Sequence, residues 1–298
     1  MVDITLLDGG MGQELIARSG DAATPLWATQ AMMDHPGLVQ SVHADYFAAG
    51  ASVATANTYA IHHDRLEKFR QDHKFSDLHA QALTEAAAAR AAFGKGRIAG
   101  SLGPLGASYR ADVIPEHQKA VALFHEVATL VGPHVDFLIA ETVASLAHAR
   151  AVLEGARSSG KPVWLSTTVD DEDGTRLRSG EAVADLAPIL QKGGARAVLA
   201  NCSAPEAMAA ALEIFKQFGL PFGAYANGFQ QITKEFLKDN PTVDVLHARP
   251  EMTPARYADF ALLWVNMGAT IIGGCCETTP AHIAEIARRL VAEGHNIV

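Results

Sequence analysis

The sequence predicts a single α/β domain, residues 1–298, folded as a (β/α)8 TIM barrel. Short apolar runs rich in Val, Ile and Leu recur eight times, each bounded by Gly, Pro or Asp, as is typical of buried strands. Alanine-rich amphipathic stretches separate these runs, and many end in glycine, a common helix stop. Strands that alternate with helices pair in parallel, and eight such units in 298 residues fit a closed barrel.

Each predicted strand is short and is followed by a polar or glycine-containing turn. The eight strands are expected at residues 4–10, 52–59, 97–104, 135–142, 162–169, 197–203, 221–228 and 269–278. The clearest helices are expected at 38–50, 79–94, 181–194 and 280–294, with Ser145, Ser203 and Thr279 as candidate N-caps or first-turn residues. An open doubly wound sheet is the alternative fold. The number of units favours the barrel, and no GxGxxG motif follows the first strand.

The longest segment without a regular pattern is 229–253, which follows the seventh predicted strand. In a barrel this segment lies at the C-terminal face, where substrates bind. It is therefore either a lid over the substrate site or a surface elaboration without a catalytic role.

Composition excludes several classes of protein. Lys and Arg number 24 against 33 Asp and Glu, and a net charge of −9 argues against a nucleic-acid partner. No stretch approaches the ~20 apolar residues of a membrane helix. The N-terminus Met-Val-Asp-Ile-Thr lacks the basic region of a signal peptide, so a cytoplasmic protein is expected. The chain has three cysteines, too few for a disulfide scaffold.

All three cysteines follow predicted strands whose ends would lie close together in a barrel. Cys202 follows the sixth strand, and Cys275 and Cys276 follow the eighth. Zinc binds Cys sulfur in a tetrahedral arrangement, and three protein ligands leave the fourth position open, as in catalytic sites. The alternatives are buried apolar cysteines and a rare vicinal disulfide. The absence of cysteine elsewhere favours a zinc site on Cys202, Cys275 and Cys276.

A site with three thiolate ligands suits an incoming thiol better than water. Zinc lowers the pKa of such a thiol and favours the nucleophilic thiolate, which indicates alkyl transfer to sulfur. Asp8 and Glu141 end the first and fourth strands on the same rim, where they could hold the ammonium of an amino-acid thiol. Their simpler interpretations are a turn-forming Asp and a carboxylate at a helix N-terminus. Trp27 is either a core residue or an aromatic wall for a cationic methyl donor.

Motifs spread along nearly the whole chain resemble those of the homocysteine S-methyltransferases, a family that includes betaine-, S-methylmethionine- and folate-dependent enzymes. NCS at 201–203 with GGCCETTP at 273–280 is the most specific combination. The supporting motifs are DGGMGQEL (8–15), PLW (25–27), ANTYA (56–60), GSLGP (100–104) and AET (140–142).

This resemblance implies a barrel with catalytic zinc on the three cysteines and homocysteine as the methyl acceptor. It also implies that Asp8 and Glu141 bind the homocysteine amine and that Thr55 contacts homocysteine. Tyr59 matches a tyrosine that occupies the fourth zinc position when homocysteine is absent. The implied partners are small molecules, homocysteine and a methyl donor.

Two departures from the family concern the methyl donor. Thr142 stands where betaine-using enzymes carry an aromatic residue, and Phe229-Gln230 follows Asn227-Gly228 where many relatives have Gly-Glu. The sequence therefore predicts a zinc-dependent methyltransferase that uses a small sulfonium, with S-methylmethionine or S-adenosylmethionine as the first candidates. The alternatives are a zinc hydrolase, which the lack of His ligands disfavours, and a non-catalytic barrel with a closed zinc or thiol site.

Overall fold

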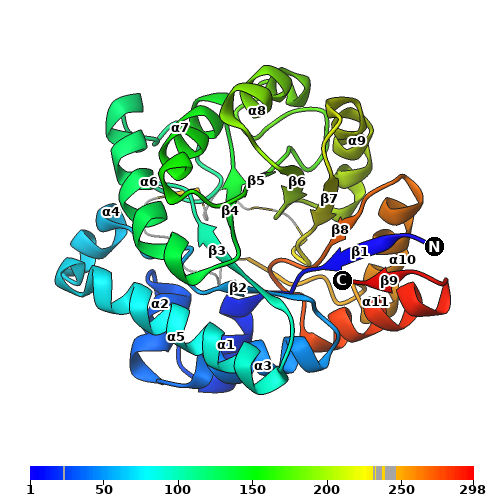
Figure 1. Ribbon diagram of the computed structural model, residues 1–298, viewed down its shortest axis with the longest axis horizontal. Helices are drawn as coiled ribbons and strands as arrows, with labels where there is room; N and C mark the ends of the chain where they lie inside the picture. Colours follow the sequence, from blue (N-terminus) through cyan, green and yellow to red (C-terminus); the bar gives the residue numbers. More distant parts are fainter. Residues whose placement is uncertain (23, 231, 233–236, 239–245) are drawn as a thin grey trace.

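The computed structural model describes residues 1–22, 24–230, 232, 237–238 and 246–298, and it confirms the predicted α/β barrel. Parallel strands curl around a central axis in the order β2-β3-β4-β5-β6-β7-β8-β1-β9, with helices on the outside (Figure 1). The strands are β1 (Asp3–Leu6), β2 (Val53–Ala56), β3 (Arg97–Leu102), β4 (Phe137–Val143), β5 (Val163–Thr167), β6 (Ala197–Asn201), β7 (Phe222–Tyr225), β8 (Ile271–Ile272) and β9 (Asn296–Ile297).

The helices follow the strands as expected, although some of their bounds differ. The predicted helix at 79–94 begins earlier, at Phe75, and the one at 181–194 is divided between a 3-10 turn and a short α-helix. The α-helices are α1 (Met11–Ser19), α2 (Trp27–Asp34), α3 (Leu38–Ala48), α4 (His63–Leu66), α5 (Phe75–Phe93), α6 (His117–Val131), α7 (Leu146–Ala156), α8 (Ala187–Gly193), α9 (Pro205–Phe215), α10 (Pro254–Asn266) and α11 (Pro280–Ala292).

Two of the three candidate N-caps are confirmed. The Ser145 hydroxyl accepts a hydrogen bond from the backbone N–H of His148, and Thr279 forms a capping box with His282. The expectation for Ser203 is wrong. Its hydroxyl accepts from the backbone N–H of Val169 at 2.9 Å, because Ser203 still lies between the ends of β5 and β6, and α9 starts only at Pro205.

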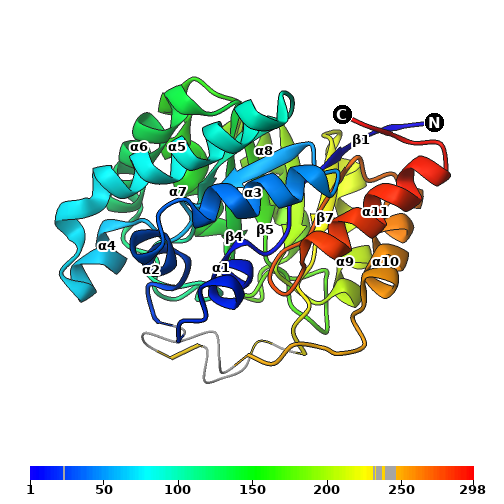
Figure 2. The same cartoon turned by 90° about the horizontal axis from the view of Figure 1, so that it is seen from below.

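The barrel closes between β1 and β2 through a short contact. The backbone N–H of Ser52 donates to the Leu6 carbonyl at 2.7 Å. The same edge of β1 also pairs with β9, a C-terminal strand that the sequence did not predict, in the register Asp3 with Asn296. Both termini therefore lie side by side at one end of the barrel (Figure 2).

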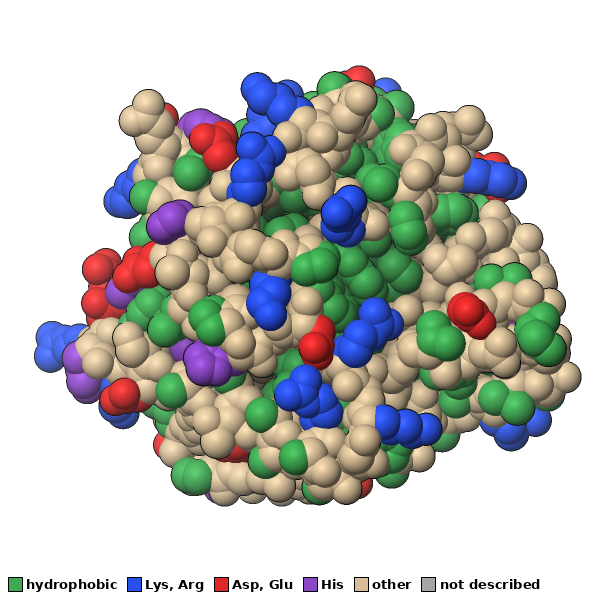
Figure 3. Space-filling model, in the orientation of Figure 1, with side chains coloured by type: hydrophobic (Ala, Val, Ile, Leu, Met, Phe, Trp, Pro, Cys, Tyr) green, Lys and Arg blue, Asp and Glu red, His purple; other side chains and the backbone are tan. Residues whose placement is uncertain are grey.

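The core has two layers, one between strands and helices and one inside the barrel. At the N-terminal ends of β4 and β5 the rings of Phe137 and Trp164 stack with their centroids 4.0 Å apart. Figure 3 shows that hydrophobic side chains gather at the centre of the face that carries the termini. The strand interior is thus filled at this end, and the space for a ligand lies at the other. No described helix is long and apolar enough to cross a membrane.

Candidate active site

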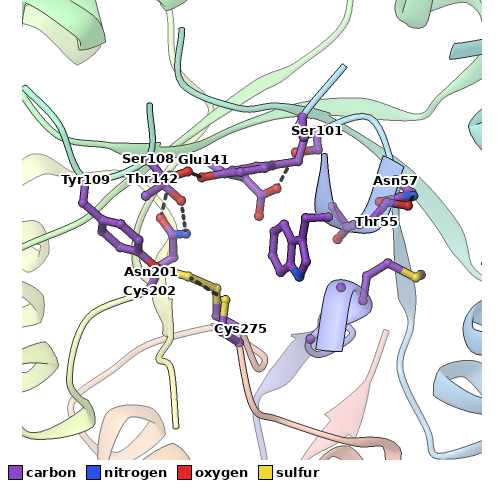
Figure 4. Close-up of a pocket in the computed structure, with 18 of the residues that line it drawn as sticks. Thr55, Asn57, Ser101, Ser108, Tyr109, Glu141, Thr142, Asn201, Cys202 and Cys275 are labelled. Carbon is purple, nitrogen blue, oxygen red and sulfur yellow. Dashed lines mark hydrogen bonds between the residues drawn. A yellow bond between two sulfur atoms is a disulfide. The ribbon is translucent and has the colours of Figure 1, made fainter. Parts of the chain in front are cut away.

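A cavity of about 450 Å³ opens at the C-terminal ends of the strands, and its volume is typical of small-molecule sites. Its wall includes residues at or just after the C-terminal ends of β1, β2, β3, β4, β6, β7 and β8 (Figure 4). All seven residues that the sequence singled out lie in this wall: Asp8, Thr55, Tyr59, Glu141, Cys202, Cys275 and Cys276.

The three sulfur atoms converge at one point of the wall. They all lie within 4.8 Å of one another, and Cys202 Sγ is 3.7 Å from Cys276 Sγ. Cys202 and Cys275 are joined by a disulfide in this structure, and Cys276 is a free thiol (Figure 4). The vicinal disulfide considered from the sequence is not the one that forms, because the pairing joins the ends of β6 and β8.

The sulfur set fits a tetrahedral metal ion once the disulfide is reduced. Metal–sulfur distances of about 2.3 Å place two sulfurs of a tetrahedron about 3.8 Å apart, close to the spacing of Cys202 and Cys276. Burial raises the pKa of the Cys276 thiol to about 12, so the free protein keeps this group protonated. A bound cation is what would make several thiolates stable in such a buried place.

Asn201 connects the ends of three neighbouring strands just before Cys202. Its side-chain carbonyl accepts from the Thr142 backbone N–H at 2.9 Å and from the Ser166 hydroxyl at 2.8 Å, and its amide donates to the Thr142 hydroxyl at 3.0 Å. Thr142 and Cys202 both adopt left-handed backbone conformations, with φ of 56° and 51°. Such conformations are costly for non-glycine residues and often mark functional sites.

Asp8 is a buried carboxylate held by Thr55. The backbone N–H of Thr55 donates to one carboxylate oxygen at 2.6 Å, and its hydroxyl donates to the other at 2.7 Å. Burial nevertheless raises the pKa of Asp8 to about 7, since desolvation outweighs these two hydrogen bonds. Behind Asp8 lies the imidazole of His43, 3.9 Å away, whose burial lowers its pKa to about 4 and keeps it neutral.

Glu141 is the second carboxylate of the cavity, and its side chain is half-buried. The Ser101 hydroxyl donates to one of its oxygens, and the Tyr225 hydroxyl donates to the other at 2.9 Å. Burial raises the pKa of Glu141, and these two hydrogen bonds oppose the shift. Two carboxylates in an apolar cavity attract a cationic group that can restore the solvation they have lost.

The Tyr59 hydroxyl is hydrogen-bonded to Ser108 at 2.8 Å, not to the cysteines. Its ring packs edge-on against Trp27, with centroids 6.5 Å apart. Trp27, Tyr59, Tyr109 and Phe229 all line the cavity, so aromatic rings make up much of its apolar wall.

Sequence reasoning missed several residues of this wall. Ser101 and Tyr225 hold Glu141, and Gln13 lies beside the Cys276 thiol. Ser101 and Gln13 fall within the motifs quoted above, and Tyr225 ends a strand in the same way as Asn201. A search of every polar strand end would have included Tyr225, but its partner becomes clear only from the curvature of the barrel.

Of the 25 residues of the segment 229–253, 12 lie outside the described residues, so its role as a lid stays untested. Its two described ends pair with each other, because Gln230 donates its backbone N–H to the His247 carbonyl and Arg249 donates to the Gly228 carbonyl. Phe229 and Leu246 from these ends line the cavity. The segment therefore begins and ends at the site.

Comparison with known proteins agrees with this site. A family model described as homocysteine S-methyltransferase matches residues 5–290. The homocysteine S-methyltransferase of Escherichia coli K12 is 32% identical over 311 residues, which cover 96% of this chain and 95% of that protein. The homocysteine S-methyltransferase YbgG of Bacillus subtilis is 29% identical, covering 95% and 93%.

Solved structures give the same result. The metallated form of the Escherichia coli homocysteine methyltransferase MmuM has a TM-score of 0.80 at 27% identity, with 96% of each chain covered. Its oxidized form also has a TM-score of 0.80, at 28% identity. These findings favour methyl transfer over the hydrolase and non-catalytic alternatives. The chain therefore belongs to the homocysteine S-methyltransferase family and is an enzyme that transfers a methyl group to homocysteine.

Proposed function

We propose that the enzyme transfers a methyl group from a small sulfonium, S-methylmethionine first among the candidates, to L-homocysteine, with zinc held by Cys202, Cys275 and Cys276. The observation that carries the proposal is the placement of three converging sulfurs and two carboxylates on one cavity wall. When bound, zinc lowers the pKa of a thiol and so favours the thiolate at neutral pH. Soft thiolate ligands suit zinc better than they suit the hard cations Mg²⁺ and Ca²⁺.

The acceptor would lie between the sulfurs and the carboxylates. Asp8 and Glu141 would hold the ammonium of homocysteine, with Thr55 fixing the orientation of Asp8 and in contact with the ligand. This leaves the homocysteine sulfur free to face the cysteines. For Tyr59 to take a metal position in the absence of homocysteine, its hydroxyl would first have to leave Ser108.

The donor would occupy the aromatic part of the cavity. Rings of Trp27, Tyr59 and Tyr109 can stabilise a sulfonium through cation–π attraction. Thr142 carries a small side chain whose hydroxyl is engaged by Asn201, so it supplies no aromatic face for a trimethylammonium group. This supports a sulfonium over betaine.

The transfer needs little help from acid–base groups. The thiolate sulfur attacks the methyl carbon, a new C–S bond forms, and the bond from methyl to the sulfonium sulfur breaks with its electron pair returning to that sulfur. The leaving group is a neutral thioether and takes up no proton. Catalysis is therefore in-line positioning of a preformed thiolate in a dry site.

The donor can be identified by a methionine-formation assay. We expect turnover with homocysteine and S-methylmethionine, weaker turnover with S-adenosylmethionine and none with betaine. Both sulfur products are methionine when S-methylmethionine is the donor, so homocysteine with an isotope label in its carbon chain is used, and labelled methionine then reports transfer to the acceptor. Efficient use of betaine would contradict the proposed donor class, while turnover with a different sulfonium would change only the candidate.

Zinc binding should depend on the oxidation state of the cysteines. We expect about one zinc per chain after reduction and none in the disulfide form, because a disulfide offers no thiolate ligand. Cys276→Ser should weaken zinc binding ~10-fold or more. Because Cys276 lies outside the disulfide, this variant tests the ligand role apart from oxidation. Titration with a competing chelator measures the number of zinc ions per chain and the affinity for zinc. An unchanged zinc affinity in Cys276→Ser would contradict the three-sulfur site.

Ionisation of Asp8 should control amine binding. With its pKa near 7, Asp8 is mostly protonated at about pH 6 and mostly ionised at about pH 8, so L-methionine, whose thioether does not titrate, should bind up to ~10-fold tighter at the higher pH. The pKa of Asp8 is higher in the folded chain than its ordinary value of 3.8, so the folded chain holds this proton more tightly than the unfolded chain. Asp8 therefore lowers the free energy of unfolding as the pH rises from about 4 to about 7.

Calorimetric titration of L-methionine across this range measures the effect. Asp8→Asn should weaken binding at pH 8 and flatten the profile, while Asp259→Asn, an exposed residue on α10, should leave it unchanged. If Asp8→Asn showed the same pH profile of L-methionine binding as the wild type, Asp8 would not be part of the amine site.

A further inference from the structure

The outer rim of the cavity carries two cations that the proposed function has not used. Arg65 lies in the single turn of α4, and Lys68 lies in the 3-10 turn Glu67–Phe69 that follows. Both line the cavity. Among the described residues, neither forms an ion pair with an Asp or Glu side chain. In a chain with a net charge of −9, two such cations beside a ligand cavity point to an anionic ligand group.

Arg65 is held in place by two contacts. Its guanidinium lies over the Tyr59 ring, 5.6 Å from the ring centre, and Nη2 donates to the Pro104 carbonyl at 3.0 Å. Nε is buried and has no hydrogen-bond acceptor. A positioned guanidinium with unfilled donor capacity is suited to a carboxylate, which matches its planar fork.

The neighbouring carboxylate does not neutralise both cations. Asp64 also lines the cavity, but one of its oxygens accepts from the backbone N–H of Gly106 and so fixes the turn that leads to Ser108 and Tyr109. Asp64 offsets one of the two positive charges, so the three charged residues of this part of the rim keep one net positive charge, while Asp8 and Glu141 make the inner wall acidic. An ammonium belongs at the inner wall and a carboxylate at the rim.

We propose that Arg65, assisted by Lys68, binds the carboxylate of the methyl donor. This rests on the proposed function, because it assigns the inner carboxylates to homocysteine and the aromatic rings to the sulfonium. The site selects sulfonium donors that carry a carboxylate, such as S-methylmethionine and dimethylsulfoniopropionate, over simple sulfonium ions.

The test compares these two donors with trimethylsulfonium, which has no carboxylate. In Arg65→Gln we expect kcat/KM to fall ~10–100-fold for the carboxylate donors, the range for a lost charged hydrogen bond. For trimethylsulfonium kcat/KM should stay within about twofold, and so should the KM for homocysteine. Arg65→Lys should recover part of the loss. Arg150→Gln, an exposed arginine on α7, is the matched control and should behave as wild type.

Two outcomes would overturn the assignment. An equal loss for all three donors would mean that Arg65 only supports the Tyr59 ring and the Pro104 turn. A rise in the KM for homocysteine alone would place the acceptor carboxylate at Arg65. Because Arg65→Gln frees the Pro104 carbonyl, Lys68→Gln provides a second test on an exposed residue, with an expected loss of ~2–5-fold for carboxylate donors only.

Direct binding separates this inference from the proposed function. Calorimetric titration of S-methylmethionine into the zinc-loaded enzyme without homocysteine requires no turnover. Tight binding to wild type, together with a Kd for Arg65→Gln that is higher by ~10-fold or more, would support the carboxylate site. This holds even if another donor proves to be the physiological one. Equal affinity in the two proteins, or no binding to wild type, would overturn it.

Discussion

The convergence of three sulfur atoms at the ends of β6 and β8 is the constraint on which the rest of the site depends. Only β7 separates these two strands, so barrel curvature brings Cys202 to within 3.7 Å of Cys276. Tyr257 reinforces this arrangement, because its buried hydroxyl lies 3.0 Å from the Ala226 carbonyl after β7 and 2.9 Å from the Gly273 carbonyl after β8. Asn201 does the same across β4, β5 and β6. The loops that carry the cysteines are thus fixed by buried hydrogen bonds.

The cavity around the sulfurs is prepared for positive charge. Burial raises the pKa values of Asp8, Glu141 and Cys276, so each anion is unstable until a cation arrives. A metal ion, an ammonium and a sulfonium each supply such a charge at a different part of the wall. The same burial excludes water, which would compete with a thiolate for its cationic partners. At the rim, the positive charges of Arg65 and Lys68 favour the anionic end of a ligand.

Much of this arrangement could be predicted from the sequence, because strand ends in a parallel barrel meet at one face. The eight apolar runs predicted the eight barrel strands. The positions of Cys202, Cys275 and Cys276 after two of these runs predicted the cluster of three sulfurs. The extra strand β9 was missed because two residues at a chain end carry no periodic pattern. β9 can pair with β1 because the start of that edge of β1, at Asp3 and Ile4, is not paired with β2.

Other features depend on three-dimensional context that a single sequence does not carry. Ser203 resembled an N-cap, but a neighbouring strand end captured its hydroxyl. The partnership of Tyr225 with Glu141 joins residues 84 positions apart, and no local signal indicates it. The sequence analysis did not single out Arg65, because its place in the cavity wall results from the packing of α4 against Tyr59.

The central claim is that the three cysteine sulfurs hold zinc and leave one position for the sulfur of homocysteine. X-ray absorption at the zinc edge of the reduced, zinc-loaded enzyme tests it most directly. The account predicts three sulfur neighbours at about 2.3 Å and one lighter neighbour in the free enzyme, changing to four sulfur neighbours when homocysteine is added. Neighbours that do not change on addition of saturating homocysteine, or a set dominated by nitrogen, would contradict it.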